Sequence, residues 1–264
     1  MPSCPDPAGT LSRLYATYND RSWLDPDPLL VVLGYESAAD MEVAGLLSAA
    51  LALGNARLIM KAARQALEPL GARPAKTLAG MGDATLRRHL AGFTYRFFDG
   101  GHLAAFLGGI RGILTDHPSI EDAFLAHDDP AQPDYAAAAS GLVRELAERS
   151  PGAWPSNLLP DPGRGSASKR TFLFLRWMVR KDAVDPGVWT RADPGRLLVP
   201  LDTHMAAACR RLGFLRRASV DLAAAREATA SLRAYSPDDP LRYDFCMTRP
   251  GIRDDLDPDS CFES

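Results

Sequence analysis

The chain has 264 residues, of which 46% are hydrophobic and 24% charged, and its formal net charge of −3 is ordinary for a soluble globular protein. No run approaches the roughly 18 apolar residues of a membrane-spanning helix, and the first residues lack the basic and apolar regions of a secretory signal. The four cysteines show no CxxC spacing, which argues against a disulfide framework, a zinc ribbon and a four-cysteine iron–sulfur cluster, so we expect a cytoplasmic protein without membrane partner, metal or other cofactor.

Apolar residues recur at a spacing of three or four along most of the chain, which is the pattern of helices. In chain order this pattern is clearest over residues 41–51, 103–114, 142–146, 172–179 and 205–212. No stretch alternates apolar and polar residues over the length of a strand, and no internal repeat is present. We therefore expect an all-α fold of about ten helices.

The domain organisation depends on the stretch 151–165, which is rich in Pro and Gly. Such a stretch is either a domain boundary or a functional hairpin. We expect one unit over residues 1–264, either undivided or split into helical subdomains at about 30–150 and 151–252, with the N-terminal residues packing on the second. Residues 253–264 form an acidic tail.

Positive charge is concentrated in one part of the chain. Between Asp161 and Arg217 there are 12 Lys or Arg residues and five acidic residues, so this segment carries +7 and the rest of the chain −10. A charge split of this kind indicates either a face that binds phosphate groups or a solvated basic helix surface.

A turn rich in Pro and Gly opens into a helix at Lys169. The sequence from Pro160 reads Pro-Asp-Pro-Gly-Arg-Gly-Ser-Ala-Ser-Lys and continues in an apolar helical pattern. Such a turn exposes backbone N–H groups beside the positive end of a helix dipole, which favours phosphate. At about 100° per residue, Arg176 and Arg180 each fall within about 20° of Lys169. The segment predicts either a phosphate-binding helix or a partly buried helix whose basic side chains reach out to solvent.

An apolar strip over residues 197–201 leads into Asp202 and another helical pattern. Asp202 is therefore placed as an N-cap, whose carboxylate is held by the first helical turn. Capping alone is enough to account for most aspartates at such a position. His204 falls in the first turn, from which its imidazole reaches an anion bound at the same helix end.

These segments together resemble the helix-hairpin-helix (HhH-GPD) DNA glycosylases. The resemblance lies in a Gly-x-Gly hairpin leading to a lysine, followed by Val-Pro-Leu-Asp-Thr-His. More closely, the chain resembles a family of uncharacterised bacterial proteins distantly related to those glycosylases. In this chain Lys169 follows the second glycine by four residues where two are typical, and Asp202 lies 33 residues further on. The closer resemblance runs from about residue 35 to 252 through motifs at 40–45, 52–55, 95–97, 165–170, 174–180, 184–189, 200–204 and 239–245.

The resemblance implies a fold around a DNA-binding cleft and a role for each matched residue. Lys169 is implied as the nucleophile of a bifunctional enzyme, and Asp202 as the carboxylate on which almost all members depend. The implied contacts to DNA phosphates are Gly163, Arg164, Gly165, Ser166, Ser168, Arg170, Arg176, Arg180 and His204. Candidates for a pocket around the flipped base are Asp40, Glu42, Tyr95, Trp177 and Tyr243.

The predicted function is that of a monomeric, nucleoid-associated DNA N-glycosylase that flips out and removes a damaged or modified base, with AP lyase activity if the lysine forms a Schiff base. One alternative is a non-catalytic nucleic-acid-binding helical module, and another is a monofunctional glycosylase in which Asp202 directs a water. An enzyme unrelated to DNA is disfavoured, because the chain shows no P-loop, Ser-His-Asp arrangement or metal-ligand cluster. The remaining histidines, His89, His102, His117 and His127, are scattered. Oxidised, alkylated and phage-hypermodified bases all stay open as targets, as does a role in repair or in defence.

Overall fold

The computed structural model describes residues 6–253, 255–257 and 262. Within these residues the chain forms thirteen α-helices, four short 3₁₀-helices and one hairpin of two-residue strands, which confirms the predicted all-α class. None of the described helices is both long enough and apolar enough to cross a membrane. Most of the predicted acidic tail lies outside the described residues, as do Cys4 and Cys261.

The chain divides into two compact units. The first, called the terminal unit below, contains the residues up to Pro26 together with those from Arg164 onward. The second, called the central unit, contains Asp27–Gly163. The boundary between the two units lies between Gly163 and Arg164, inside the stretch 151–165.

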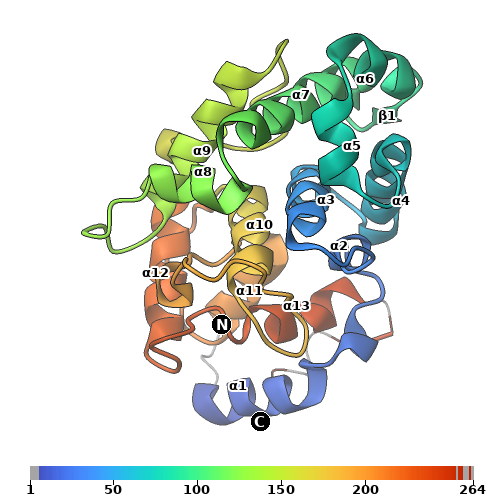
Figure 1. The fold of residues 1–264 in the computed structure, drawn as a ribbon. Helices are drawn as coiled ribbons and strands as arrows, with labels where there is room; N and C mark the ends of the chain where they lie inside the picture. The colour runs from blue at the N-terminus through green and yellow to red at the C-terminus, as the bar shows by residue number, and fades with distance from the viewer. Residues whose placement is uncertain (1–5, 254, 258–261, 263–264) are drawn as a thin grey trace. The chain divides into compact units, whose positions relative to one another are not determined.

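In the central unit, helix α7 (Gly100–Asp116) is the element against which most others pack (Figure 1). It contacts α5, α6, α8 and α9. Gly109 lets α9 approach α7 closely, because a β-carbon at this position would overlap the Leu146 carbonyl oxygen. The other helices and strands of the unit are α2 (Leu29–Val32), α3 (Ala38–Ala50), α4 (Ala56–Leu67), α5 (Pro74–Gly80), α6 (Asp83–Leu90), β1 (Thr94–Tyr95), β2 (Phe98–Asp99), α8 (Ile120–Ala126) and α9 (Ala136–Arg149).

Helix α3 carries two carboxylates that the sequence analysis assigned to a base pocket, and both are buried structural groups. The Ser37 hydroxyl donates to Asp40 Oδ2 at 2.5 Å, and the Ala75 N–H donates to Asp40 Oδ1 at 2.9 Å. Glu42 accepts the first two backbone N–H groups of α8 at 3.1 and 2.9 Å. Both carboxylates thus satisfy the open donors of helix starts, which is a structural role, and a place for them in a base pocket stays a prediction.

Two of the scattered histidines meet at one carboxylate. His117 and His127 each place Nε2 on a different oxygen of Glu145, at 2.8 and 2.7 Å. Arg149, one helical turn further along α9, bonds the same carboxylate at 2.8 Å through Nε. Burial would raise the pKa of Glu145, but the hydrogen bonds from His117, His127 and Arg149 outweigh it and lower the pKa to about 2. This cluster ties α9 to the segments that follow α7 and α8.

In the terminal unit, α13 (Asp244–Ile252) packs against both α1 and α11 (Figure 1). Helix α1 therefore belongs with the last helices of the chain, although it comes first in the sequence. Asp6 caps α1 by accepting the Gly9 N–H at 2.9 Å. The other helices of the unit are α1 (Pro7–Tyr18), α10 (Lys169–Val179), α11 (Thr203–Arg211) and α12 (Leu222–Arg233).

Glu145→Gln should lower the free energy of unfolding at neutral pH and flatten its dependence on acid. The folded-state pKa lies below the ordinary value of 4.5, so the contribution of the carboxylate is complete above about pH 4.5 and is lost as the pH falls toward about 2. Urea unfolding at a series of pH values measures this. Glu148→Gln is the matched control, because Glu148 is exposed on the same helix. An acid profile for Glu145→Gln that overlays the parent profile would contradict the role given to the cluster.

Candidate active site

Helix α10 belongs to the terminal unit, is buried along its length and begins at the residue predicted as the nucleophile. Residues 170–179 are all buried, and a helix that is buried on every side belongs to a core. Lys169, at the first position of the helix, keeps 29% of its side chain exposed. The core therefore fixes the helix, while the amine lies where the interior meets solvent.

The chain that follows α10 turns back along it and returns to Lys169. The backbone N–H groups of Gly187 and Trp189 donate at 3.2 and 2.8 Å to carbonyls in the last turn of α10, which satisfies groups that a helix end leaves open. A buried apolar strip over residues 197–201 then leads to Asp202. This return path explains how residues 33 positions apart reach the same end of α10.

Lys169 and Asp202 face each other. The distance from Lys169 Nζ to Asp202 Oδ2 is 3.6 Å, and each side chain is 29% exposed. The other carboxylate oxygen, Oδ1, accepts the Met205 N–H at 2.9 Å, which confirms the predicted N-cap of α11. One oxygen thus anchors the carboxylate to the helix, and the second is directed at the lysine. A fixed amine and a fixed carboxylate at a partly exposed position offer a nucleophile and a negative charge to the same reacting atom.

The loop before Lys169 has a defined and partly strained backbone. Gly165 has a φ of +80°, and Ser168 has a φ of +43°, which is left-handed for a residue with a side chain. The Ser168 N–H donates to the Ser166 hydroxyl at 3.0 Å, and the Leu222 N–H donates to the Gly165 carbonyl at 3.0 Å. The first bond closes the loop on itself, and the second attaches it to the start of α12.

Two of the backbone donors predicted to bind phosphate are already used. The Gly163 N–H donates to the Asp161 carboxylate at 2.8 Å, and the Ser168 N–H is the donor to Ser166 described above. Gly163 also belongs to the central unit. Phosphate binding by these two amides would have to displace these local bonds, whereas Arg164 is an exposed cation that forms no ion pair with a described residue.

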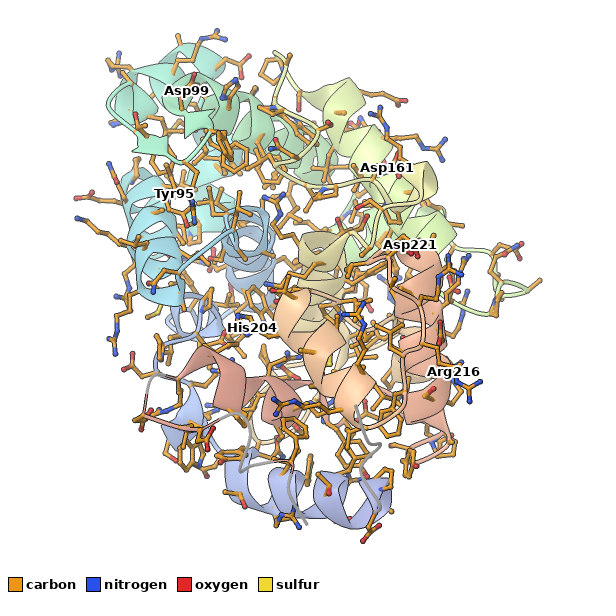
Figure 2. All side chains as sticks on the ribbon, turned by 180° about the vertical axis from the view of Figure 1, so that it is seen from behind. Tyr95, Asp99, Asp161, His204, Arg216 and Asp221 are labelled. Carbon is orange, nitrogen blue, oxygen red and sulfur yellow. The ribbon has the colours of Figure 1, made fainter. Side chains whose placement is uncertain are left out.

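His204 lies in the first turn of α11, two residues beyond Asp202, and its side chain is exposed. Figure 2 shows His204 at the start of α11 and Asp221 at the start of α12. The imidazole lies over Gly251 of α13, where a β-carbon would come within 2.9 Å of Nδ1. The ring is thus placed at the helix end that also holds the Asp202 carboxylate.

Arg176 is a buried group paired with two carboxylates. It is 4% exposed, and its guanidinium bonds Asp185 through Nε at 3.1 Å and Nη2 at 2.8 Å. Its remaining nitrogen, Nη1, bonds Asp244 of α13. Because these contacts occupy the guanidinium and exclude solvent, the prediction that Arg176 binds DNA phosphate is wrong.

Arg180 is buried next to it, at 2% exposure, and holds three carboxylates. Nη1 bonds Asp185 at 2.7 Å, Nη2 bonds Asp182 at 2.7 Å, and Nε lies 3.0 Å from both oxygens of Asp239. Burial works against the charged guanidinium, but the carboxylates of Asp185, Asp239 and Asp182 raise the pKa of Arg180 above its ordinary value. The prediction that Arg180 binds phosphate is therefore wrong as well.

The buried arginines and aspartates form one cluster, called the buried charge cluster below: Arg176, Arg180, Asp182, Asp185, Asp239 and Asp244. It joins the C-terminal end of α10 to the turn that follows and to the start of α13. Burial raises the pKa of Asp244, Arg176 opposes this, and the carboxylates of Asp185 and Asp202 add to the rise. The charge of Asp202 thus acts on Asp244, a member of the cluster, from the other end of α10.

The remaining predicted residues have structural surroundings. Arg170 and Trp177 are buried at 7% and 1% exposure, so neither fits the predicted contact to phosphate or to a base. Tyr243 packs edge-on against Tyr15 at a ring distance of 5.8 Å. The Tyr95 hydroxyl donates to a backbone carbonyl in the loop before α4 at 2.7 Å, and Tyr95 belongs to the central unit. Among the described residues, no group of three or more His, Cys, Asp or Glu side chains is arranged to hold a metal ion.

A family model described as protein of unknown function (DUF2400) matches residues 27–253 of the chain. The chain belongs to the DUF2400 family. No curated protein matches it, and no solved structure does. The residues matched include Lys169, Asp202 and all members of the buried charge cluster.

The aspartates that neutralise the two buried arginines are the part of this arrangement that sequence reasoning missed in this DUF2400 protein. Asp185, Asp239 and Asp244 lie in the same motifs as the tryptophan and aromatic residues on which the resemblance depends. One signal was available: two arginines lie one helical turn apart in an otherwise apolar helix, and such arginines need carboxylate partners if they are buried. Helical periodicity places the two arginines on the same face of the helix, but it does not tell whether that face is exposed to solvent.

Asp185→Asn should destabilise this DUF2400 protein by about 3–5 kcal/mol, because it leaves Arg176 and Arg180 buried with too little negative charge. Chemical denaturation followed by circular dichroism measures the change. Asp238→Asn is the matched control, since Asp238 is exposed in the loop before α13 and should have little effect. Equal stability of the two variants would show that the cluster does not hold the terminal unit together.

Proposed function

We propose that this protein is a DNA N-glycosylase in which Lys169 is the nucleophile and Asp202 the essential carboxylate. The observation that carries the proposal is the 3.6 Å separation of Lys169 Nζ from Asp202 Oδ2, at two helix starts that 33 residues separate in the sequence. The resemblance to helix-hairpin-helix glycosylases assigns these roles to the same two residues. Geometry and resemblance therefore agree on one pair.

The chemistry asked of the pair is the breaking of an N-glycosidic bond. As the base departs with the bonding electrons, the sugar acquires positive charge at C1′, and a fixed carboxylate such as Asp202 stabilises that charge. Because Asp202 is anchored through Oδ1 to the Met205 N–H, its negative charge is held in place without reorganisation. Its second oxygen, Oδ2, stays available on the side of the lysine.

Lys169 completes the reaction as a covalent nucleophile. The neutral amine attacks C1′, a C–N bond forms to the lysine as the bond to the base breaks, and the proton lost by the amine passes to the departing base. Ring opening of this adduct gives a Schiff base, from which β-elimination releases the 3′ phosphate and nicks the strand. The product is a nicked strand with the protein released by hydrolysis.

The DNA backbone is held by exposed groups around the pair. Arg164 and His204 supply cationic or hydrogen-bonding contacts, and the loop at Gly165 and Ser166 presents backbone to a phosphate. Arg170, Arg176 and Arg180 are buried, so three of the positive charges that the composition assigned to a basic face do not lie at the surface. This proposal therefore assigns phosphate binding in the terminal unit to fewer residues than the sequence did. The fold as a whole is proposed to be of the helix-hairpin-helix glycosylase type, with the base flipped toward the Lys169–Asp202 pair.

Asp202→Asn should abolish base excision while leaving DNA binding within a few-fold of the parent protein. The amide keeps the shape and the capping oxygen but removes the charge that stabilises the cation. The measurement is a panel of duplexes, each with one oxidised, alkylated or hypermodified base, treated with alkali to reveal abasic sites. Asp6→Asn is the matched control, because Asp6 is also an N-cap in the terminal unit and has no lysine partner among the described residues. Excision at the parent rate by Asp202→Asn would reduce Asp202 to a cap.

Lys169→Gln should lose strand nicking in the same panel without alkali treatment. A glutamine cannot form the Schiff base from which β-elimination proceeds. Lys181→Gln serves as the control, because Lys181 is an exposed lysine close in sequence. Excision without nicking in the parent protein would identify a monofunctional enzyme in which Asp202 directs a water. No excision of any base, together with salt-sensitive DNA binding, would identify a non-catalytic binding module.

A further inference from the structure

The central unit contains a second concentration of positive charge that the total for the chain conceals. Residues 56–97 include eight Lys or Arg residues and two acidic residues, Glu68 and Asp83, so this segment carries +6. Asp83 is itself paired with Arg111 at 2.5 Å. The carboxylates within the segment therefore neutralise little of its positive charge.

These cations lie at the surface. All eight are exposed: Arg57, Lys61, Arg64, Arg73, Lys76, Arg87, Arg88 and Arg96. Among the described residues, all but Arg57 are also without an ion-pair partner. This differs from the segment 161–217, where Arg176 and Arg180 are buried in carboxylate pairs.

The cations belong to elements that are joined to one another. Arg57, Lys61 and Arg64 recur at a spacing of four and three and so share one face of α4. A shallow groove lined by Gln65 and His89 connects the end of α4 with the end of α6. A second groove is lined by residues of α5 and α6, Lys76 and Thr85 among them, and Figure 1 shows α4, α5, α6 and β1 grouped in one part of the central unit.

An aromatic ring projects into solvent beside these helices. Phe97 is 70% exposed, more than the other large hydrophobic residues that are exposed in the described chain. It lies at the tip of the hairpin formed by β1 and β2, in a two-residue loop with Arg96. The flanking Phe98 is 1% exposed, so the base of the hairpin is anchored in the core while its tip is not.

The backbone of the tip is held in an unusual conformation. Arg96 has a φ of +54°, at a position of a two-residue hairpin loop where glycine or asparagine is usual. Its guanidinium lies against Gly54, where a β-carbon would overlap it, and the neighbouring Tyr95 hydroxyl donates to the Leu53 carbonyl at 2.7 Å. The hairpin is thus tied to the loop that precedes α4, and Phe97 is presented at a fixed place.

We propose that α4, α5, α6 and the hairpin form a second DNA-binding surface, in which the cations follow the phosphate backbone and Phe97 stacks on a base. Positive charge on exposed helices is complementary to a polyanion, and an exposed aromatic ring among cations is the combination with which proteins hold both the backbone and the bases of nucleic acid. This inference rests on the proposed function for the choice of DNA as the partner. It adds to that function a binding surface in the unit that lacks Lys169 and Asp202.

The test uses the full chain and the anisotropy of a fluorescent duplex that carries one unpaired nucleotide. Reversing Arg57, Lys61 and Arg64 together to Glu should weaken binding at least tenfold and reduce the slope of log Kd against log salt by about 2–3, since each lost phosphate contact contributes about 0.9. Arg144→Glu is the charge control, because Arg144 is exposed on α9, outside the surface. An unchanged affinity and salt slope would overturn the assignment of the cations.

Phe97→Ala should weaken binding to the same duplex about tenfold, whereas Phe97→Trp should retain it, because stacking needs an aromatic face. Tyr235→Ala is the control, because Tyr235 is an exposed aromatic residue of the terminal unit, outside the surface. Equal affinities for the alanine and tryptophan variants would overturn the stacking role. Because Phe97 is exposed, the two Phe97 variants and the parent protein should have the same thermal unfolding midpoint.

Two further outcomes separate this inference from the proposed function. If no base is excised but the charge reversal and Phe97→Ala still weaken DNA binding, the glycosylase proposal fails and the surface stands. If excision occurs and neither change affects DNA binding or excision, the surface fails and the glycosylase proposal stands. Binding of the parent protein to vesicles rich in anionic lipid, lost in the same variants while duplex binding is unchanged, would replace DNA by a membrane surface and overturn the inference.

Discussion

The terminal unit depends on two arginines that are buried and must be neutralised there. An unpaired guanidinium in a core is unfavourable by several kcal/mol, so its carboxylates have to come from wherever the chain can bring them. Arg176 and Arg180 obtain theirs from the turn after α10, from the loop before α13 and from α13 itself. This requirement fixes three segments to one end of α10. The geometry of the candidate site follows from it, because the same segments determine where the chain returns to Asp202.

The candidate site itself is small and lies at the opposite end of the same helix. Lys169 begins α10 and Asp202 caps α11, and both are partly exposed, while the rest of α10 is buried and α11 buries one face. A reactive pair built on helix starts in a rigid core keeps its geometry without a ligand, which is the condition for electrostatic stabilisation of a transient cation. The roles thus separate by burial: the buried charges hold the fold, and the proposed function assigns the chemistry to the exposed pair.

Much of this arrangement was predictable from the sequence, and the reasons for the exceptions are physical. Helical periodicity identified the all-α class, and the apolar strip before Asp202 identified it as an N-cap. The same periodicity placed Lys169, Arg176 and Arg180 on one helix face, but it could not tell that α10 is buried on every side. The carboxylates of Asp185 and Asp244 neutralise the arginines through tertiary contacts, and no local sequence pattern reveals such contacts.

The net charge of the whole chain also conceals the charge of the central unit. A remainder of −10 outside residues 161–217 conceals the +6 of residues 56–97, because sums over long segments average over separate surfaces. His117 and His127 likewise look unrelated in the sequence and meet only because Glu145 lies between them in space. Phe97 is exposed because it lies at the tip of a hairpin that is anchored at Leu53. Strands of two residues are too short for a sequence pattern to predict this hairpin.

The measurement that tests the account most directly is borohydride trapping followed by peptide mapping. The protein is incubated with the panel of modified duplexes in the presence of borohydride, which reduces an imine between lysine and C1′ to a stable amine. Protease digestion and mass spectrometry then locate the sugar remnant. The account predicts that the remnant is on the peptide that contains Lys169 and that Asp202→Asn prevents its formation. A remnant on any other peptide, or base excision with no trapped adduct, would contradict the assignment of Lys169 as the nucleophile.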